Sequence, residues 1–240
     1  MKIKIVVPII TNVFNNEIIR EANQFKSQDT EVEVVNLDKG TASIESNYDE
    51  ILAGPDIVKK VKKAEEDGFD GVFIDCFGDP AVDAAREVVD IPVVGGFQPA
   101  VLTASLLCKK WSIVTVLKSV VPMIQDLCRK TGIMDNVASI RDIDTPVLEL
   151  QDKKVMQSRL LVQIEKAIND DGAQGIVLGC TGMLGLAQDL QNEVSKKNVY
   201  IPVIDPTAAA IGFLEQLHRS KISHSKLTYQ RPVEKERNFE

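Results

Sequence analysis

One stretch of this chain occurs twice, and that repeat constrains the fold more than any other feature. Residues 68–78 read GFDGVFIDCFG and residues 172–182 read GAQGIVLGCTG. The two copies are separated by 104 positions, which aligns Cys76 with Cys180 and keeps three glycines in register. A chain with an internal repeat of this length is expected to build two similar structural units.

Each copy of the repeat lies within an alternation of apolar, β-branched runs and helical stretches. KIKIVVPI (2–9) and KWSIVTVL (110–117) open the two halves, and IPVV (91–94) and IPVI (201–204) close them. Strands that alternate with helices indicate a parallel sheet covered on both faces. The sequence therefore predicts an α/β fold of two pseudo-symmetric, flavodoxin-like lobes, each with a mainly parallel sheet flanked by helices.

Two Asp-Pro pairs predict where helices begin. Asp79-Pro80 and Asp205-Pro206 each combine a good N-cap residue with a proline at the first helical position. The segment after Ser220 is polar and charged, which is typical of a surface tail. Because no linker or low-complexity stretch separates the halves, the two lobes are expected to pack tightly together.

Composition excludes several classes of function. The chain has 240 residues, a net charge of −7 with no basic block and only 5% aromatic residues, so neither nucleic acid nor an anionic membrane is an expected partner. Its apolar runs are too short to span a bilayer. No export signal is recognisable, so a cytoplasmic location is expected, where cysteines remain free thiols. The partner is then a small-molecule substrate, and the sequence leaves open whether the chain forms a homo-oligomer.

The sequence predicts no cofactor and no metal site. The Gly-rich signatures that bind nucleotide phosphates are absent, and no Cys-x-x-Cys pair occurs. The only histidines, His218 and His224, lie near the C-terminus, away from every strand end. Cys108 and Cys128 lie in helical stretches, where packing in a core or at its boundary is the expected role.

The repeated cysteines each have two interpretations. A buried cysteine most often fills a core as a small apolar side chain. However, Cys76 and Cys180 follow parallel strands, and ligands bind beyond the carboxyl ends of such strands. If the lobes face each other, the thiols lie on opposite walls of one cleft. Each would then meet a helix N-terminus, whose dipole lowers the pKa of a thiol.

Two facing thiols without a histidine favour one kind of chemistry. A cysteine hydrolase needs a histidine base beside its nucleophile. Two opposed thiols can instead remove a proton from one face of a carbon and return one to the other face. We therefore predict a cofactor-independent racemase or epimerase that inverts a carbon acid next to a carbonyl, with Cys76 and Cys180 as catalytic residues.

Backbone amides next to the thiols are candidates for substrate binding. The N–H groups of Gly78, Asp79, Thr181 and Gly182 could form two opposed nests for carbonyl or carboxylate oxygens. Ordinary turn geometry also explains the two glycines. Asp79 serves better as a helix cap than as an acid.

Further polar residues near strand ends each have a functional and a structural interpretation. Ser46 and Tyr48, in the loop after the second strand, either contact the substrate or are ordinary residues of a surface loop. Thr115 ends a strand and either points into the cleft or serves β-structure alone. Asp75 is a carboxylate inside an apolar strand, for which a cation partner is expected.

These motifs resemble those of a known family. Cys76-Phe77-Gly78-Asp79-Pro80 and Gly179-Cys180-Thr181-Gly182-Met183 resemble the two cysteine motifs of the Asp/Glu/hydantoin racemase superfamily. Two further segments resemble the hydantoin/allantoin racemase branch of that superfamily. They are residues 42–50, with Ala42-Ser43-Ile44-Glu45 and Tyr48-Asp49-Glu50, and residues 112–122. The resemblance runs from about residue 1 to residue 217.

The resemblance implies two pseudo-symmetric lobes, with the helix after each half's last strand crossing over. Lobe 1 would comprise residues 1–98 plus 207–240, and lobe 2 residues 99–206. It also implies Cys76 and Cys180 as the acid/base pair. The branch usually carries Asn-Pro-Asn after the first strand, where this chain has Val7-Pro8-Ile9, so Pro8 marks that part of the substrate site.

Other functions remain compatible with the sequence. A maleate-type cis–trans isomerase of the same superfamily keeps both cysteines, whereas the decarboxylases generally keep one. A non-catalytic small-molecule binding protein can also have two α/β lobes around a cleft. The candidate substrates of the predicted racemase are hydantoin, allantoin and free amino acids.

Overall fold

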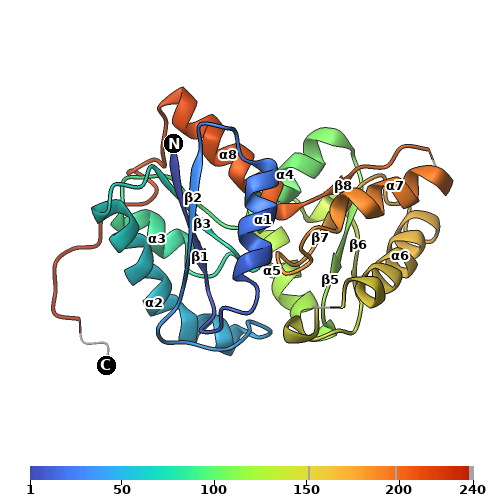
Figure 1. Ribbon diagram of the computed structural model, residues 1–240, viewed down its shortest axis with the longest axis horizontal. Coiled ribbons are helices and arrows are strands. Elements are labelled where there is room, and N and C mark those ends of the chain that lie inside the picture. The colour runs from blue at the N-terminus through green and yellow to red at the C-terminus, as the bar shows by residue number, and fades with distance from the viewer. Residues whose placement is uncertain (151, 198, 238–240) are drawn as a thin grey trace.

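A computed structural model describes residues 1–150, 152–197 and 199–237. It contains two four-stranded parallel sheets, with strand orders β2-β1-β3-β4 and β6-β5-β7-β8 (Figure 1). The strands are β1 (Lys2–Val7), β2 (Glu31–Asn36), β3 (Gly71–Ile74), β4 (Val93–Val94), β5 (Trp111–Thr115), β6 (Val137–Asp142), β7 (Ile176–Leu178) and β8 (Val203–Ile204). The identical strand order confirms that the repeat encodes two lobes of one topology.

Helices cover the sheets. The α-helices are α1 (Asn15–Phe25), α2 (Asn47–Glu66), α3 (Val82–Val88), α4 (Phe97–Leu107), α5 (Val121–Thr131), α6 (Lys153–Asn169), α7 (Ala187–Lys197) and α8 (Pro206–Ser220). Three short 3₁₀ helices are η1 (Lys118–Val120), η2 (Met134–Asn136) and η3 (Val147–Glu149). In the part of the chain that the structure describes, no helix is long and apolar enough to cross a bilayer.

The central strands are buried along almost their whole length because both faces of each sheet are covered. Every residue of β3, β5 and β7 is buried. In the N-terminal sheet, Ile3 of β1 pairs with Val32 of β2 and with Gly71 of β3. Strands buried on both faces show continuous rather than alternating hydrophobicity, which is the pattern seen in the sequence.

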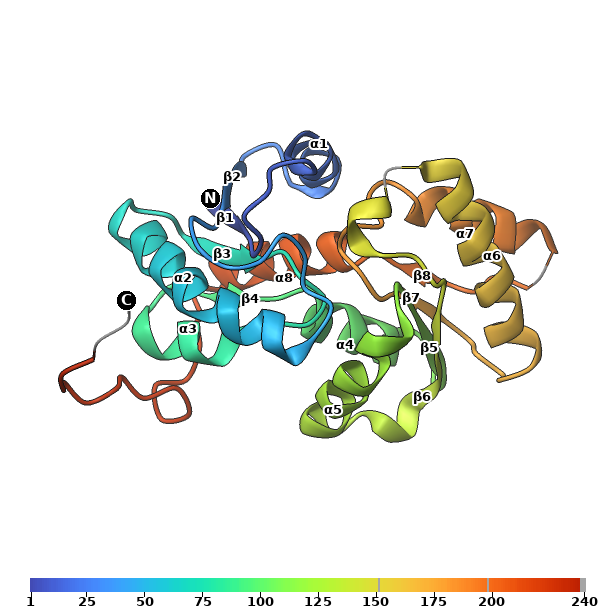
Figure 2. The ribbon, with the colours of Figure 1, turned by 90° about the horizontal axis from the view of Figure 1, so that it is seen from below.

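Two helices cross between the lobes. α4 follows the last strand of the first half, yet its Phe97 packs in the core of the second sheet with Trp111. α8 follows the last strand of the second half, and its Leu214 packs against Ile3 and Ile5 of β1. Figure 2 shows α4 and α8 in the middle of the molecule, where they pack against each other. The two halves are thus interlocked, whereas the residue numbers predicted for the lobe boundaries stay a prediction.

One of the two predicted helix caps is confirmed and the other is wrong. The Asp205 carboxylate accepts the Ala208 N–H at 2.9 Å, one turn into α8. The Asp79 carboxylate instead accepts the N–H groups of Phe97 and Gln98, at 2.8 and 3.2 Å, and so caps α4. Asp79 has a positive φ of 49°, and the chain turns so far that α3 begins only at Val82. A local sequence pattern gives no sign of such a long-range cap.

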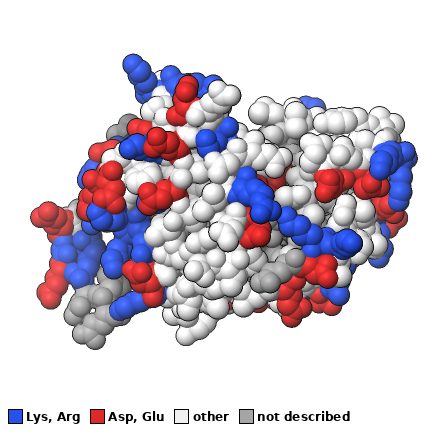
Figure 3. Space-filling view, in the orientation of Figure 1, with Lys and Arg blue, Asp and Glu red and all other residues white. Residues whose placement is uncertain are grey.

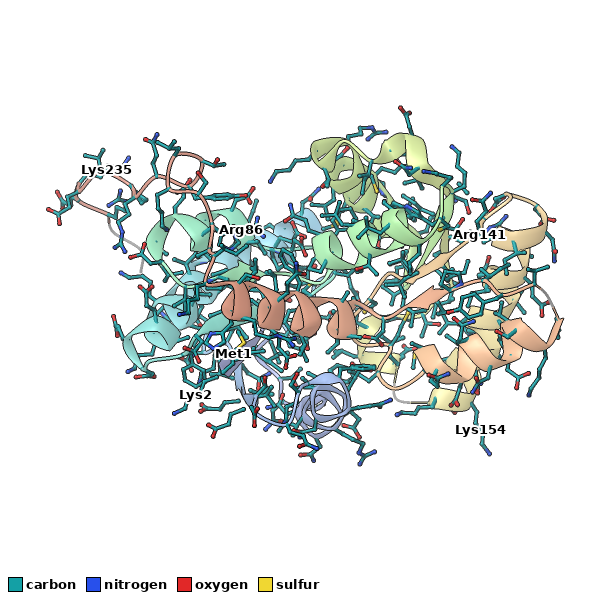
Figure 4. All side chains as sticks on the ribbon, turned by 90° about the horizontal axis from the view of Figure 1, so that it is seen from above. Met1, Lys2, Arg86, Arg141, Lys154 and Lys235 are labelled. Carbon is teal, nitrogen blue, oxygen red and sulfur yellow. The ribbon has the colours of Figure 1, made fainter. Side chains whose placement is uncertain are left out.

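The segment after α8 runs back over the N-terminal lobe. The Arg86 guanidinium donates to the Tyr229 hydroxyl at 3.0 Å, and His224 Nε2 accepts the Val93 N–H at 2.7 Å. Arg86 and Lys235 are labelled on the same lobe in Figure 4. On the face drawn in Figure 3, charged side chains of both signs are dense at the left, and others lie near the middle and at the right beside broad uncharged areas.

We expect Leu214→Ala to lower the free energy of unfolding by about 2–5 kcal/mol, because it opens a cavity where α8 meets β1. Leu214 is fully buried, whereas Leu106 on α4 is 88% exposed. Urea denaturation followed by circular dichroism measures the change, and Leu106→Ala is the matched control. Equal stability of the two variants would contradict the packing of α8 described here.

Candidate active site

Both repeated cysteines line a single cavity between the lobes. Cys76 follows the end of β3 at Ile74, and Cys180 follows the end of β7 at Leu178. The cavity contains about 790 Å³ of space that no atom fills, part of it open to solvent. The repeat thus brings two equivalent positions, one from each lobe, to the lining of one hollow, whereas their placement on opposite walls stays a prediction.

The cavity wall is mainly apolar. Its apolar side chains come from both lobes and are Val7, Pro8, Ile9, Phe14, Ile18, Ile44, Phe77, Val116, Val120, Met123, Ile124, Leu127, Val147 and Leu184. Besides the cysteines, its polar side chains are Glu50, Asp75, Thr115 and Thr181. In the part of the chain that the structure describes, no Lys, Arg or His lines this cavity.

Each thiol accepts a hydrogen bond from the amide two residues further on. Gly78 N–H donates to Cys76 Sγ at 3.4 Å, and Gly182 N–H donates to Cys180 Sγ at 3.3 Å. A donor aimed at sulfur favours the thiolate over the thiol. Gly78 and Gly182 therefore serve the cysteines in this structure, and an amide nest for a substrate oxygen stays a prediction.

Burial raises the pKa of both thiols, so the predicted lowering is wrong. Burial raises the pKa of Cys180 to about 12, and the charges of Asp75 and Glu45 act in the same direction. Burial also raises the pKa of Cys76 well above its ordinary value, and the N–H of Gly78 opposes this only in part. The helices that follow the two cysteines begin only at Val82 and Ala187, so neither thiol lies at the first turn of the helix that was expected to follow it directly.

The structure brings some of the predicted substrate-binding residues to the cavity and leaves others away from it. Ser46 caps α2 by accepting the Asp49 N–H at 3.2 Å, and the Tyr48 side chain is 69% exposed. Asp79 is occupied as the cap of α4. The predicted residues that do line the cavity are Pro8, Gly78, Thr115, Thr181 and Gly182.

A hydrogen bond between the lobes joins the two cysteine loops. Thr181 Oγ1, next to Cys180, donates to the backbone carbonyl of Asp75, next to Cys76, at 3.1 Å. Thr115 Oγ1 donates in turn to the carbonyl of Gly179 at 3.0 Å. The two threonine hydroxyls therefore hold the loops in place.

Asp75 lies among other carboxyl groups, so the predicted cation partner is wrong. Among the ion pairs of the described residues, none involves Asp75. Its Oδ1 is buried without a hydrogen-bond partner. Burial raises the pKa of Asp75 to about 7, and the nearby Asp205 adds to the effect. Burial likewise raises the pKa of Glu21, beside Asp205 and Asp75, to about 8.

Glu50 is a cavity residue that the sequence reasoning missed. It lies in the first turn of α2, and burial together with the charge of Asp79 raises its pKa to about 7. A Cβ placed on Gly78 would lie 2.5 Å from Glu50 Oε1 and 3.6 Å from Cys76 Sγ. The carboxyl group and the thiol are thus neighbours across a glycine. The available signal was the motif Tyr48-Asp49-Glu50, which carried the family resemblance but no assigned role.

The other two cysteines lie outside the cavity lining. Cys128 is fully buried in α5, and Cys108 caps the C-terminus of α4 with its amide bonded to the Ala104 carbonyl. Within the described residues, no group of three His, Cys, Asp or Glu side chains is arranged to hold a metal ion.

Known proteins are similar to this chain in sequence and in fold. The profile of the Asp/Glu/hydantoin racemase family matches residues 8–214. The chain belongs to this family. A hydantoin racemase from Pseudomonas sp. (strain NS671) is 38% identical over 238 residues, which cover 98% of this chain and 94% of that protein.

Two solved structures extend the comparison. The crystal structure of an allantoin racemase from Pseudomonas fluorescens matches with a TM-score of 0.93 and 31% identity, covering 100% of both chains. The allantoin racemase from Klebsiella pneumoniae matches with a TM-score of 0.92 and 32% identity, covering 98% of this chain and 95% of that one. This member of the family is a racemase of the hydantoin/allantoin racemase-like branch.

We expect Asp75→Asn to remove part of the dependence of stability on pH. The pKa of Asp75 rises on folding from 3.8 to about 7, so its stabilising contribution is present below pH 3.8 and is lost as the pH rises through 7. Between pH 5 and pH 8 the wild type should therefore lose about 2–3 kcal/mol relative to the variant, measured by urea denaturation.

Asp29→Asn is the control, because it removes one carboxyl group from the exposed surface and leaves the buried Asp75 in place. If Asp75→Asn followed the wild type at every pH, Asp75 would not be a buried carboxyl that holds its proton near neutrality.

Proposed function

We propose that the protein racemises a carbon acid next to a carbonyl by proton transfer between Cys76 and Cys180. The observation that carries this proposal is that thiols from equivalent positions of the two lobes line one cavity. The charge of Cys180 also raises the pKa of Cys76, which agrees with two sulfur atoms that share one site. Activity of this kind needs no cofactor.

In the proposed reaction, one cysteine begins as a thiolate and the other as a thiol. The thiolate removes the proton from the substrate carbon and becomes a thiol, which leaves an enolate with its charge on the carbonyl oxygen. The opposite thiol then donates its proton to the other face of that carbon and becomes the thiolate. One proton is exchanged at each sulfur, so the two cysteines trade roles in each turnover.

The environment of the thiols sets the requirements of this reaction. Because burial disfavours both thiolates, a thiolate that does form is a strong base. The N–H groups of Gly78 and Gly182 offset part of that cost at either sulfur. The low-dielectric, mainly apolar cavity also strengthens any hydrogen bond to the developing enolate.

We propose a 5-substituted hydantoin with an apolar substituent as the substrate. Relatives that are named hydantoin racemase and allantoin racemase support a ring of this type. The apolar wall, which includes Phe14, Met123 and Leu127, favours an alkyl or aryl substituent over the polar ureido group of allantoin. Val7 and Ile9 flank Pro8 where the branch usually has asparagines, which acts in the same direction.

Cys76→Ser and Cys180→Ser should each lose racemisation by at least the 10²–10⁴-fold typical of one acid–base group. Each variant keeps one thiol, which can still remove the proton of the enantiomer that faces it. In D₂O, each should exchange that hydrogen for deuterium with retention of configuration, and the two variants should prefer opposite enantiomers. Polarimetry and proton NMR with the separate enantiomers of 5-benzylhydantoin measure both effects.

Cys108→Ser is the matched control, because Cys108 is a partly buried thiol outside the cavity lining. Racemisation at the wild-type rate in either cavity variant would rule out the acid–base pair. A decarboxylase would release CO₂ from a malonate-type substrate, a cis–trans isomerase would convert maleate, and a binding protein would exchange no hydrogen at all.

A further inference from the structure

The walls of the cavity offer few polar side chains to a ligand. The hydroxyl of Thr181 donates to the carbonyl of Asp75, and the hydroxyl of Thr115 donates to the carbonyl of Gly179. Asp75 also lines the cavity, and its Oδ1 atom is buried without a hydrogen-bond partner. Glu50 is less buried than Asp75, and within the described residues no hydrogen bond occupies its carboxyl group, so this group is well placed to meet a ligand.

The local structure holds the helical turn from which the Glu50 side chain projects. Glu50 belongs to the first turn of α2. The hydroxyl of the N-cap Ser46 donates a hydrogen bond to the Asp49 carboxylate at 2.7 Å, which holds that turn. Asp49 also accepts the Glu45 N–H at 3.1 Å. The side chain then reaches over Gly78, where any Cβ would collide with its Oε1. The glycine thus opens the path from α2 to the thiol of Cys76.

We propose that Glu50 contacts the substrate and selects a ring that presents an N–H group beside the reacting carbon. This inference rests on the function proposed above and names the group that recognises the ring. An ionised carboxylate accepts an N–H, and charge-assisted hydrogen bonds are about twice as strong as neutral ones. The same carboxylate repels a free amino acid's carboxylate, for which the described cavity wall offers no Lys, Arg or His.

The surroundings of Glu50 determine how its contribution depends on pH. Cys76 and Asp79 face it from their loop, and Asp126 and Lys130 of α5 lie around the adjoining pocket that Glu50 also lines. Burial and Asp79 raise its pKa to about 7, so it gains a proton and loses its acceptor charge as the pH falls through 7. The kcat/KM of the wild type should therefore decline below that pH.

The experiment compares Glu50→Ala and Glu50→Gln with Glu66→Gln, a control at the exposed end of the same helix. With 5-benzylhydantoin, Glu50→Ala should raise KM by about 10- to 100-fold with a smaller change in kcat, as expected for a lost hydrogen bond to a charged group. Glu50→Gln keeps an acceptor and should fall between the alanine variant and the wild type. Both Glu50 variants should lose the decline of kcat/KM below pH 7.

Methylated substrates identify the contact. Methylation of one ring nitrogen should weaken the wild type about 10-fold or more and should weaken Glu50→Ala little further, because the hydrogen bond is already absent. If the effects of Glu50→Ala and of methylation were additive at both ring nitrogens, the proposal would be overturned. A KM of Glu50→Ala equal to that of the wild type would also overturn it. If the wild type itself did not racemise hydantoins, the proposed function would fail, whatever Glu50 does.

Discussion

The hydrogen bond from the Thr181 hydroxyl to the Asp75 carbonyl connects the two lobes at the point where their cysteines lie. Each partner is the immediate neighbour of a cysteine, so this single bond fixes one thiol loop against the other. The crossing of α4 and α8 supports this contact. α4 follows the first half of the chain but packs in the core of the second lobe, and α8 follows the second half but packs in the core of the first lobe. The cavity lined by both thiols lies between lobes that are interlocked in this way.

Burial of the thiols has opposite effects on the two halves of a proton-transfer cycle. It makes a thiolate scarce, and it makes that thiolate a stronger base once formed. The amides of Gly78 and Gly182 moderate the first effect in the same way on both walls. The proposed racemisation gains from this shared feature, because in it each sulfur acts as a base in one direction and as an acid in the other.

The sequence was sufficient to predict features that repeat or that depend on local chemistry. The 104-residue spacing predicted two lobes of one topology, and Asp205-Pro206 predicted the start of α8. Asp79-Pro80 looked the same locally, but Asp79 caps a helix that begins 18 positions further on, at Phe97. Glu50 escaped notice for a related reason, because its proximity to Cys76 arises only when α2 packs over Gly78.

The differences between the two copies of the repeat matter as much as their shared cysteines. Glu50 borders the wall of Cys76, whereas Leu150 approaches Gly182 on the wall of Cys180, with its Cδ1 3.0 Å from where a Cβ would lie. Inversion of a carbon leaves the rest of a ring unchanged, so one polar anchor can hold both enantiomers while the hydrogen changes faces. In the proposed reaction, the duplicated thiols supply the symmetric chemistry, and residues that diverged between the halves supply the recognition that keeps the ring in one orientation.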